Sequence, residues 1–261
     1  IVGAGSAGCV LANRLSEDPD TSVCVLEAGG RDGSPTIRMP AALGVNTASG
    51  RHNWRFQTTP QTRLNNRSIY TPRGKGLGGS SSINGLVFVR GHANDFDRWE
   101  NQGAAGWNYN SVLPYFKKLE HWHGPDTHYR GASGPVHVTR RPVQNPLDRA
   151  FLAAGPQAGF TTTDDINGQK QEGFGCFDAN IHDGERQRAS AAYLHPAISR
   201  PNLSVQTKAH VTRVLFEGTR AVGVEFVNRG KPHELRANRA VILCAGAIQT
   251  PQLLMLSGVG D

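Results

Sequence analysis

Hydrophobic and polar positions alternate with two different periods along this chain. Near the N-terminus, "IVGAG" predicts a short strand and a glycine turn, and the apolar residues of 6–15 recur at helical spacing. "SVCVLE" then predicts a second strand that ends at Glu27. Beyond 202, "SVQT", "HVTRVLF" and "AVGVEFVN" alternate with the period of two that is typical of strands. The pattern predicts an α/β fold.

The C-terminal segment completes this pattern. "RAVILCAGA" predicts a buried strand and a glycine turn, and a helix follows over 248–256. Because strands that alternate with helices form parallel sheets, we expect a doubly wound parallel sheet with an inserted β-meander. Residues 141–204 are rich in Pro, Gly, Asn and Asp, with helical patches at 146–154 and 189–198. We expect this stretch to leave the first domain as an α+β insertion.

Gly3, Gly5 and Gly8 form the pattern G-x-G-x-x-G between the first strand and the helix. Such glycines allow a tight turn, close approach of a pyrophosphate to the backbone and close packing of helix on strand. Glu27 lies nineteen residues after Gly8, where an acid binds ribose hydroxyls and repels a 2′-phosphate. The combination favours dinucleotide binding over a purely structural turn. It disfavours NADP and leaves FAD and NAD open.

A second glycine segment, "RGKGLGGSSSINGLVFVRG", spans 73–91. Its composition is typical of a flexible linker. However, Arg73 and Lys75 place positive charge beside the glycines, and the apolar residues that follow without a polar spacer suit a buried segment. The segment therefore favours a main-chain cradle for a flat or anionic ligand over a tight structural turn.

Charge and composition restrict the classes of partner. The net charge is +7 and the pI is about 9.5, yet the basic residues are scattered, without a basic run or interleaved aromatics. We therefore expect no nucleic-acid partner. No apolar run approaches the roughly 18 residues that a membrane span needs. The four cysteines show no C-x-x-C spacing, which favours a reducing compartment and no structural zinc.

The run "HWHGPDTH" is a candidate metal site, since His121, His123 and His128 lie near Asp126. A Gly-Pro pair breaks any helix there, and no further cluster of ligands supports a site. We expect a surface loop and no bound metal.

Two long motifs resemble those of the glucose–methanol–choline (GMC) flavoprotein oxidoreductases. "GKGLGGSSSINGLVFVRGHANDFD" is similar to that family's first diagnostic motif, and "GAIQTPQLLMLSGVG" at 246–260 is similar to its second. Within the family, "NWRFQTTPQ", "RGHANDFDRW", "TDDINGQKQEGFG" and "ERQRASAAYLHPAISRPNL" most resemble choline dehydrogenases and related bacterial alcohol dehydrogenases. The resemblance covers essentially the whole chain but only the N-terminal half of a typical member.

The resemblance implies FAD as cofactor. Members with covalent flavin carry a His where this chain has Ile83, so we expect non-covalent FAD. By resemblance, the cofactor-binding positions are Gly3, Gly5, Ser6, Ala7, Gly8, Glu27, Ala28, Trp54, Arg73, Gly78, Gly79, Ser80, Asn84, Gly85, Val211, Ala245 and Gly246.

The resemblance also predicts the domain organisation. Residues 1–140 and 205–261 would form the FAD-binding domain, and 141–204 the first part of a substrate-binding domain. The C-terminal half of the family fold would lie outside this chain, together with the family's catalytic His, so we name no catalytic residue. Asp164, Asp165 and Arg188 are expected to be surface or ion-pair residues rather than active-site groups.

The implied reaction is oxidation of a primary alcohol, choline-like or aliphatic, to the aldehyde by hydride transfer to the flavin. The electron acceptor is a quinone, another acceptor or oxygen, and the location is cytoplasmic or at the surface of the inner membrane. We expect this chain to be inactive alone. Three alternatives stay open: an FAD-containing lyase of the hydroxynitrile type, an NAD-dependent dehydrogenase, and a non-catalytic FAD-binding module that needs a partner.

Overall fold

The computed structural model describes residues 1–125 and 128–260 and divides into two compact units. Unit 1 comprises Ile1–Gly85 and Arg188–Asp261, and unit 2 comprises Leu86–Gln187. These limits differ from the domain limits predicted at 140 and 204, because strands from both sides of 140 share one sheet in unit 2. The assignment of cofactor and substrate binding to separate domains stays a prediction.

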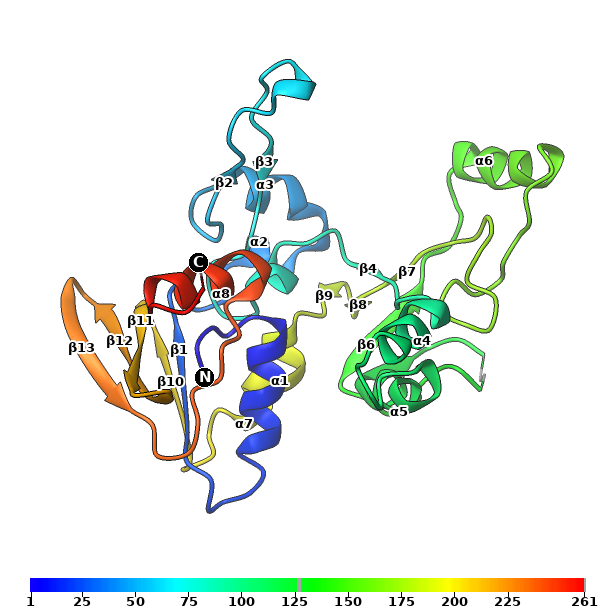
Figure 1. The fold of residues 1–261 in the computed structure, drawn as a ribbon. Helices are drawn as coiled ribbons and strands as arrows, with labels where there is room; N and C mark the ends of the chain where they lie inside the picture. Colours follow the sequence, from blue (N-terminus) through cyan, green and yellow to red (C-terminus); the bar gives the residue numbers. More distant parts are fainter. Residues whose placement is uncertain (126–127, 261) are drawn as a thin grey trace. The chain divides into compact units, whose positions relative to one another are not determined.

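The elements of unit 1 come from both ends of the chain (Figure 1). In chain order they are α1 (Ser6–Leu15), β1 (Val23–Glu27), α2 (Pro35–Arg38), η1 (Pro40–Ala42), α3 (Leu43–Ala48), β2 (Phe56–Gln57), η2 (Thr62–Leu64), β3 (Tyr70–Thr71), η3 (Gly79–Ser82), the π-helical turn η4 (Ser190–Leu194), α7 (His195–Ala197), β10 (Leu203–Thr207), β11 (Ala209–Glu217), β12 (Arg220–Asn228), β13 (Lys231–Arg236) and α8 (Gly246–Leu256).

A parallel sheet forms the centre of unit 1. β1 pairs in parallel with β10, and Val2 extends the sheet through parallel bridges to β1 and to Leu243. Val2 donates its N–H to the carbonyl of Ile242 at 2.8 Å and accepts from Cys244 N at 2.7 Å. The predicted α/β class is thereby confirmed. The strands predicted at Ile1 and in "RAVILCAGA" are wrong in extent, since a glycine turn follows directly in both segments and leaves single bridges.

The predicted meander is an antiparallel sheet in the order β11–β12–β13, and α8 lies along β11. The sequence did not predict β13, because "KPHELR" contains Pro and charged residues but no apolar alternation. One apolar core joins the parallel strands, the meander and α8. Its buried members are Val2, Leu26, Ala209, Val211, Val214, Val224, Phe226 and Leu253.

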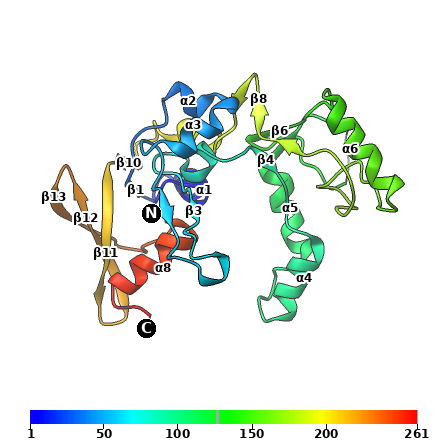
Figure 2. The same ribbon diagram turned by 90° about the horizontal axis from the view of Figure 1, so that it is seen from above.

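Unit 2 contains a small sheet in the order β4–β7–β6–β5, in which only the β5–β6 pair is parallel. α4 and α5 are neighbouring helices of this unit (Figure 2). Phe96 of α4 and Tyr109 and Leu113 of α5 form a buried cluster between them. In chain order the elements are β4 (Val87–Phe88), α4 (Ala93–Asn101), α5 (Tyr109–Leu119), β5 (Glu120–Trp122), β6 (Val136–Arg140), α6 (Pro146–Gln157), β7 (Asp178–Ala179), β8 (Ile181–His182) and β9 (Glu185–Arg186).

Buried charged side chains connect the sheet of unit 2. Glu120 accepts hydrogen bonds from the guanidinium groups of Arg90 at 2.5 Å and Arg130 at 2.6 Å. Asp178 accepts from Arg130 at 2.9 Å and from Arg140 at 3.0 Å. Both carboxylates are fully buried. Because an isolated buried charge is costly, each carboxylate depends on its arginine partners.

The structure also locates the charged residues that were expected to be structural. Asp165 forms ion pairs with two arginines of unit 2, and Arg188 pairs with Asp32 in unit 1 at 2.6 Å. Asp164 lies exposed. The ion-pair interpretation is confirmed for Asp165 and Arg188.

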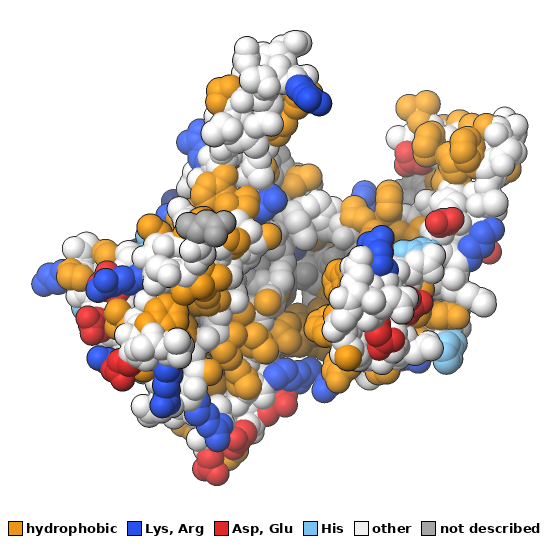
Figure 3. All heavy atoms as spheres, viewed as in Figure 1, with side chains coloured by type: hydrophobic (Ala, Val, Ile, Leu, Met, Phe, Trp, Pro, Cys, Tyr) orange, Lys and Arg blue, Asp and Glu red, His pale blue; other side chains and the backbone are white. Residues whose placement is uncertain are grey.

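No helix within the described ranges is long and apolar enough to cross a bilayer. On the face shown in Figure 3, Lys and Arg side chains lie among Asp and Glu side chains rather than in one block.

Candidate functional site

The two glycine segments lie against each other in unit 1. Gly78 N donates to the carbonyl of Ala4 at 2.8 Å. A Cβ added to Gly79 would lie 2.7 Å from Gly5 Cα, and one added to Gly8 would lie 1.9 Å from Gly3 O. Such distances exclude any side chain, so glycine is required for this backbone packing. The segment 73–91 is therefore no linker, at least up to Ser82 where η3 ends.

The later part of the second glycine segment differs from expectation. Ile83 and Leu86 are buried, but Val87 and Val89 are 48% and 54% exposed. The predicted burial of this apolar run is wrong beyond Leu86. The reason is that β4 is only two residues long and pairs with β7, which leaves its alternate side chains in solvent.

Glu27 joins the glycine segments through its carboxylate. Oε2 accepts from Ala4 N at 2.9 Å, and Oε1 accepts from Gly29 N at 2.7 Å and Gly76 N at 2.9 Å. Burial raises the pKa of the Glu27 carboxyl, and the three amide hydrogen bonds oppose that effect. Oε2 accepts one N–H where Oε1 accepts two, so Oε2 keeps capacity to accept another donor.

A cavity of about 820 Å³ lies beside these segments, within the size range of small-molecule sites. Two helices begin at its wall. The cap residues are Gly5 for α1 and Ala245 for α8, and neither cap makes a side-chain hydrogen bond. Neither first turn contains an acidic residue. The free N–H groups and the positive dipole ends of both helices therefore face the same space, which suits an anionic ligand.

An aromatic group forms another part of the wall. Trp54 and Phe56 stack with ring centroids 5.9 Å apart, and His210 lies 5.6 Å from the Trp54 ring. The ammonium of Lys75 sits over Trp54 at 4.2 Å. Burial, and then the charge of Lys75, lowers the pKa of His210 and favours its neutral form. Flat rings of this kind suit stacking with a planar ring system.

Buried polar contacts also hold the segment 188–195, which includes η4 and packs against α1. The carboxylate of Asp32 accepts from Arg188 Nε at 2.6 Å, Ser190 Oγ at 2.6 Å and His195 Nε2 at 3.1 Å. Burial acts to raise the pKa of Asp32, but the hydrogen bonds from His195, Ser190 and Arg188 outweigh it and lower this pKa. Asn13 of α1 donates to Tyr193 O at 2.7 Å, which ties η4 to the helix.

Most of the predicted cofactor-binding residues come together at this cavity. Those that line it are Gly3, Gly5, Ser6, Ala7, Glu27, Ala28, Trp54, Arg73, Gly79, Ser80, Val211, Ala245 and Gly246. Gly8 and Gly78 lie behind the wall, where they make the backbone contacts described above. Asn84 and Gly85 lie exposed, away from the lining. Contact of these residues with FAD stays a prediction.

Several lining residues were not predicted. Phe56 stands two positions after Trp54, but Arg55 between them has a φ of 58°, so the alternation of an extended strand does not bring the two rings together. His210 and Thr212 flank Val211 on β11, and Gln249 and Gln252 lie on α8. Nothing in their local sequence marks them, because the fold alone brings β11 and α8 to the cavity.

The cavity fits a ligand that carries a diphosphate. A Cβ on Gly5 would meet only Gly79 Cα at 3.9 Å, so the space beside Gly5 belongs to the cavity and not to packed protein. Arg73 lines the same space. Main chain without side chains, two helix N-termini and a basic residue together match the recognition of a dinucleotide phosphate group.

The chain is similar to known proteins along its whole length. It matches the family described as GMC oxidoreductase over residues 1–261. The oxygen-dependent choline dehydrogenase of Sinorhizobium fredii is 54% identical over 260 residues, covering 100% of this chain and 47% of that protein. The mitochondrial choline dehydrogenase of Homo sapiens is 53% identical over 268 residues, covering 100% of this chain and 45% of that protein.

Among solved structures, pyridoxine 4-oxidase from Mesorbium loti superposes with a TM-score of 0.94 at 35% identity. The match covers 99% of this chain and 51% of that chain. The chain thus spans about half the length of the proteins it matches.

Proposed function

The chain belongs to the GMC oxidoreductase family, and we propose that it binds FAD and takes part in the oxidation of a small primary alcohol to an aldehyde. The observation that carries this proposal is that two helix N-termini without side-chain caps and the main chain of several glycines line one and the same cavity. A choline-like alcohol is the first candidate substrate, since two relatives more than half identical to the chain are named choline dehydrogenases.

The residues of this chain would hold FAD through main-chain donors and one carboxylate. The first-turn N–H groups of α1, at Ser6 and Ala7, and of α8, at Ala247, would donate to the diphosphate. Glu27 would accept from a ribose hydroxyl through Oε2. Arg73 would add positive charge beside the diphosphate.

Bound FAD supplies hydride-accepting chemistry. The part of this chain is to bind and orient the cofactor by rigid backbone. We assign no catalytic base among the described residues.

Ile83 supports non-covalent attachment. Its side chain is buried and offers no nucleophile. Acid denaturation should therefore release free flavin into the supernatant, whereas colour that stays with the precipitated protein contradicts this part of the proposal.

The binding proposal is tested by Gly5→Ala. This Cβ would not clash with the protein, so the fold should persist with a stability loss of about 1 kcal/mol or less, as expected for Ala at a helix N-cap. It would occupy the ligand's space, so the dissociation constant for FAD, measured by fluorescence titration, should rise at least about tenfold, equivalent to about 1.4 kcal/mol. Gly44→Ala, on exposed α3 with nothing within 4 Å, is the matched control and should bind FAD normally. Unchanged FAD affinity in Gly5→Ala contradicts the proposed cradle.

The reaction is tested in the full-length protein. Addition of choline or an aliphatic alcohol without oxygen should bleach the yellow flavin and yield the aldehyde. Reoxidation by a quinone or dye, compared with formation of hydrogen peroxide in air, identifies the acceptor. Release of aldehyde and cyanide from an added hydroxynitrile without bleaching would indicate a lyase, and FAD binding without any turnover would indicate a binding module.

A further inference from the structure

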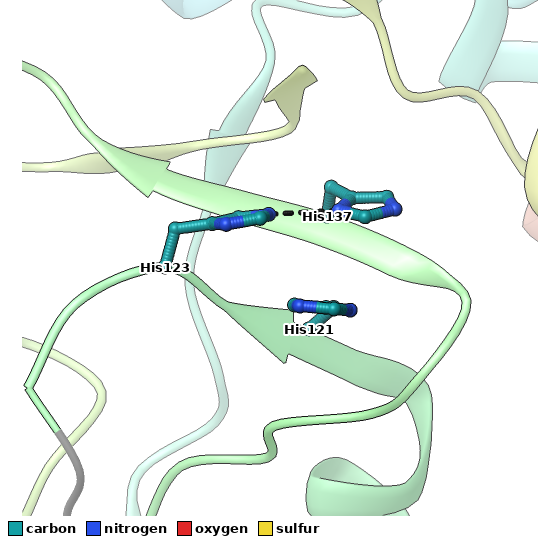
Figure 4. A group of neighbouring side chains, drawn as sticks. All are labelled: His121, His123 and His137. Carbon is teal, nitrogen blue, oxygen red and sulfur yellow. Dashed lines mark hydrogen bonds between the residues drawn. The ribbon is translucent and has the colours of Figure 1, made fainter.

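Three imidazoles gather on one face of the sheet in unit 2. His121 lies in β5, His123 follows that strand directly, and His137 lies in β6. The parallel pairing of β5 with β6 places His121 opposite His137. One ring nitrogen from each of the three lies within 4.8 Å of the others (Figure 4).

The strand geometry holds these rings on the accessible face. Glu120 and Trp122 alternate with the histidines along β5 and are buried on the other side of the sheet. The Arg130 guanidinium lies 3.8 Å from the centre of the Trp122 ring, and Trp122 N donates to Gly131 O at 2.7 Å. Since the inward side chains are held in place, the backbone directs His121 and His123 toward the outer face of the sheet.

Two of the three imidazoles are already joined by a hydrogen bond. His123 Nε2 and His137 Nδ1 lie 2.7 Å apart, so one donates N–H to the lone pair of the other. Imidazole ligates a metal in its neutral form, through a ring nitrogen that carries no hydrogen.

A fourth ring supports the group from one side. His182 of β8 stacks on His137 with ring centroids 3.8 Å apart, and its Nε2 lies 3.4 Å from the carboxylate of Asp183. This contact limits rotation of the His137 ring. The Asp183 carboxylate contacts His182, and the other three imidazoles lie beside one another.

We propose that His121, His123 and His137 form a binding site for a divalent transition-metal ion of the zinc type. Three neutral imidazole nitrogens suit Zn²⁺, Ni²⁺ or Cu²⁺, whereas Mg²⁺ and Ca²⁺ prefer oxygen ligands, of which this group has none. The shared N–H moves to the other nitrogen of its ring when both facing nitrogens ligate the metal. Water completes the coordination.

Metal binding requires the rings to turn, because their planes now lie 15–22° from parallel and an imidazole lone pair lies in the plane of its ring. Zn–N bonds of about 2.0–2.1 Å place tetrahedral ligand nitrogens about 3.4 Å apart, so separations of up to 4.8 Å must close and the 2.7 Å separation of His123 Nε2 from His137 Nδ1 must open. His123 is exposed and follows the end of β5, so its side chain is free to make this adjustment. The proposal differs from the sequence-based expectation of a surface loop without bound metal, which stays untested. His137, distant in sequence, replaces His128 in the group, and Asp126 lies outside the described residues.

The proposal is tested by calorimetric titration of ZnCl₂ into the FAD-loaded full-length protein. We expect one saturable site that weakens about 10- to 100-fold or more in His123→Asn and in His137→Asn, since loss of a ligand costs at least as much as loss of an outer-shell partner. His128→Asn, an exposed neighbour outside the group, is the matched control and should bind Zn²⁺ as the parent does.

A second readout counts the ligands. With one equivalent of Cu²⁺, the electron paramagnetic resonance spectrum should show nitrogen hyperfine structure from three imidazoles in the parent and from two in His123→Asn. Circular dichroism verifies that each variant is folded. The proposal is overturned by absence of Zn²⁺ binding, by binding that survives both substitutions, or by binding that His128→Asn abolishes equally.

Discussion

The glycine cradle of unit 1 and the sheet of unit 2 bury polar groups in opposite ways. In unit 1 the buried Glu27 carboxylate receives hydrogen bonds from backbone amides alone, and main chain lies directly on main chain at Gly8 and Gly79. In unit 2 the buried Glu120 carboxylate receives hydrogen bonds from two arginine side chains and from one backbone amide, Gly131 N at 3.0 Å. The glycine cradle is therefore sensitive to added atoms, and the sheet of unit 2 to lost charges.

This contrast follows from what each region holds. A cradle for a diphosphate needs exposed N–H groups and space, which side chains would fill. A small sheet with only a modest aromatic cluster needs other contacts to join its strands, and multivalent arginines provide them. The contrast is tested by substitutions that add atoms to the cradle of unit 1 or remove charges from the sheet of unit 2.

The largest effect is expected for Glu120→Ala in unit 2. The change removes the carboxylate that pairs with the buried Arg90 guanidinium, while Arg130 keeps Asp165 and Asp178, and breaking a buried pair typically costs about 3–5 kcal/mol. Hydrogen exchange followed by mass spectrometry should show faster exchange in peptides from 86–187 and little change elsewhere.

The control for this substitution is Asp95→Ala, which removes an exposed ion pair with Arg98 in the same unit. Exposed pairs contribute about 0–1 kcal/mol, so exchange should stay near that of the parent. Equal exchange in Glu120→Ala and Asp95→Ala contradicts the idea that the buried network holds unit 2 together.

A smaller effect, in unit 1, is expected for Gly8→Ala. The new Cβ would lie 1.9 Å from Gly3 O, so backbone must shift, and overpacking typically costs about 1–3 kcal/mol. FAD affinity should fall together with stability, whereas Gly5→Ala should lose affinity with a stability loss of about 1 kcal/mol or less. Thermal unfolding without and with FAD separates the two outcomes. A Gly8→Ala protein as stable as Gly44→Ala is incompatible with the close packing described.

The same contrast explains how much the sequence predicted. α1, β1 and α8 follow from local periodicity, and the glycine cradle follows from turns whose requirements are local. The partners of Glu120 lie ten and thirty residues away in the chain, at Arg130 and Arg90, and no pattern in the sequence joins them.

Sites built by strand pairing were likewise beyond prediction. His137 joins His121 only through the register of β5 with β6, and His210 reaches the cavity only through the position of β11. The strand expected at 241–244 has the right direction but contributes one bridge, because the hydrophobic pattern carries no information on where a ladder ends.

Two buried carboxylates of unit 1 sharpen the contrast at the level of single charges. Burial raises the pKa of Glu27, which has only amide donors. Asp32 is also buried, but a histidine, a serine and an arginine lower its pKa. The two groups therefore give unit 1 opposite dependences of stability on pH.

The smallest effects are expected in these pH dependences. Unfolded Glu titrates near pH 4.3, and Glu27 in the fold titrates higher, so the native state holds an extra proton in between and stability falls as pH rises through that window. Asp32 titrates below the unfolded value near pH 3.9, so its contribution is present above that pH and is lost on acidification. Each slope is at most about 1.4 kcal/mol per pH unit.

In denaturant titrations of the FAD-free protein, Glu27→Gln should flatten the fall in stability above about pH 4.3, and Asp32→Asn should flatten the fall below about pH 3.9. Each substitution also lowers stability uniformly through lost hydrogen bonds, so the slopes carry the test. Unchanged slopes in both variants would show that backbone amides and side-chain donors do not shift the pKa values of the two carboxyls in opposite directions.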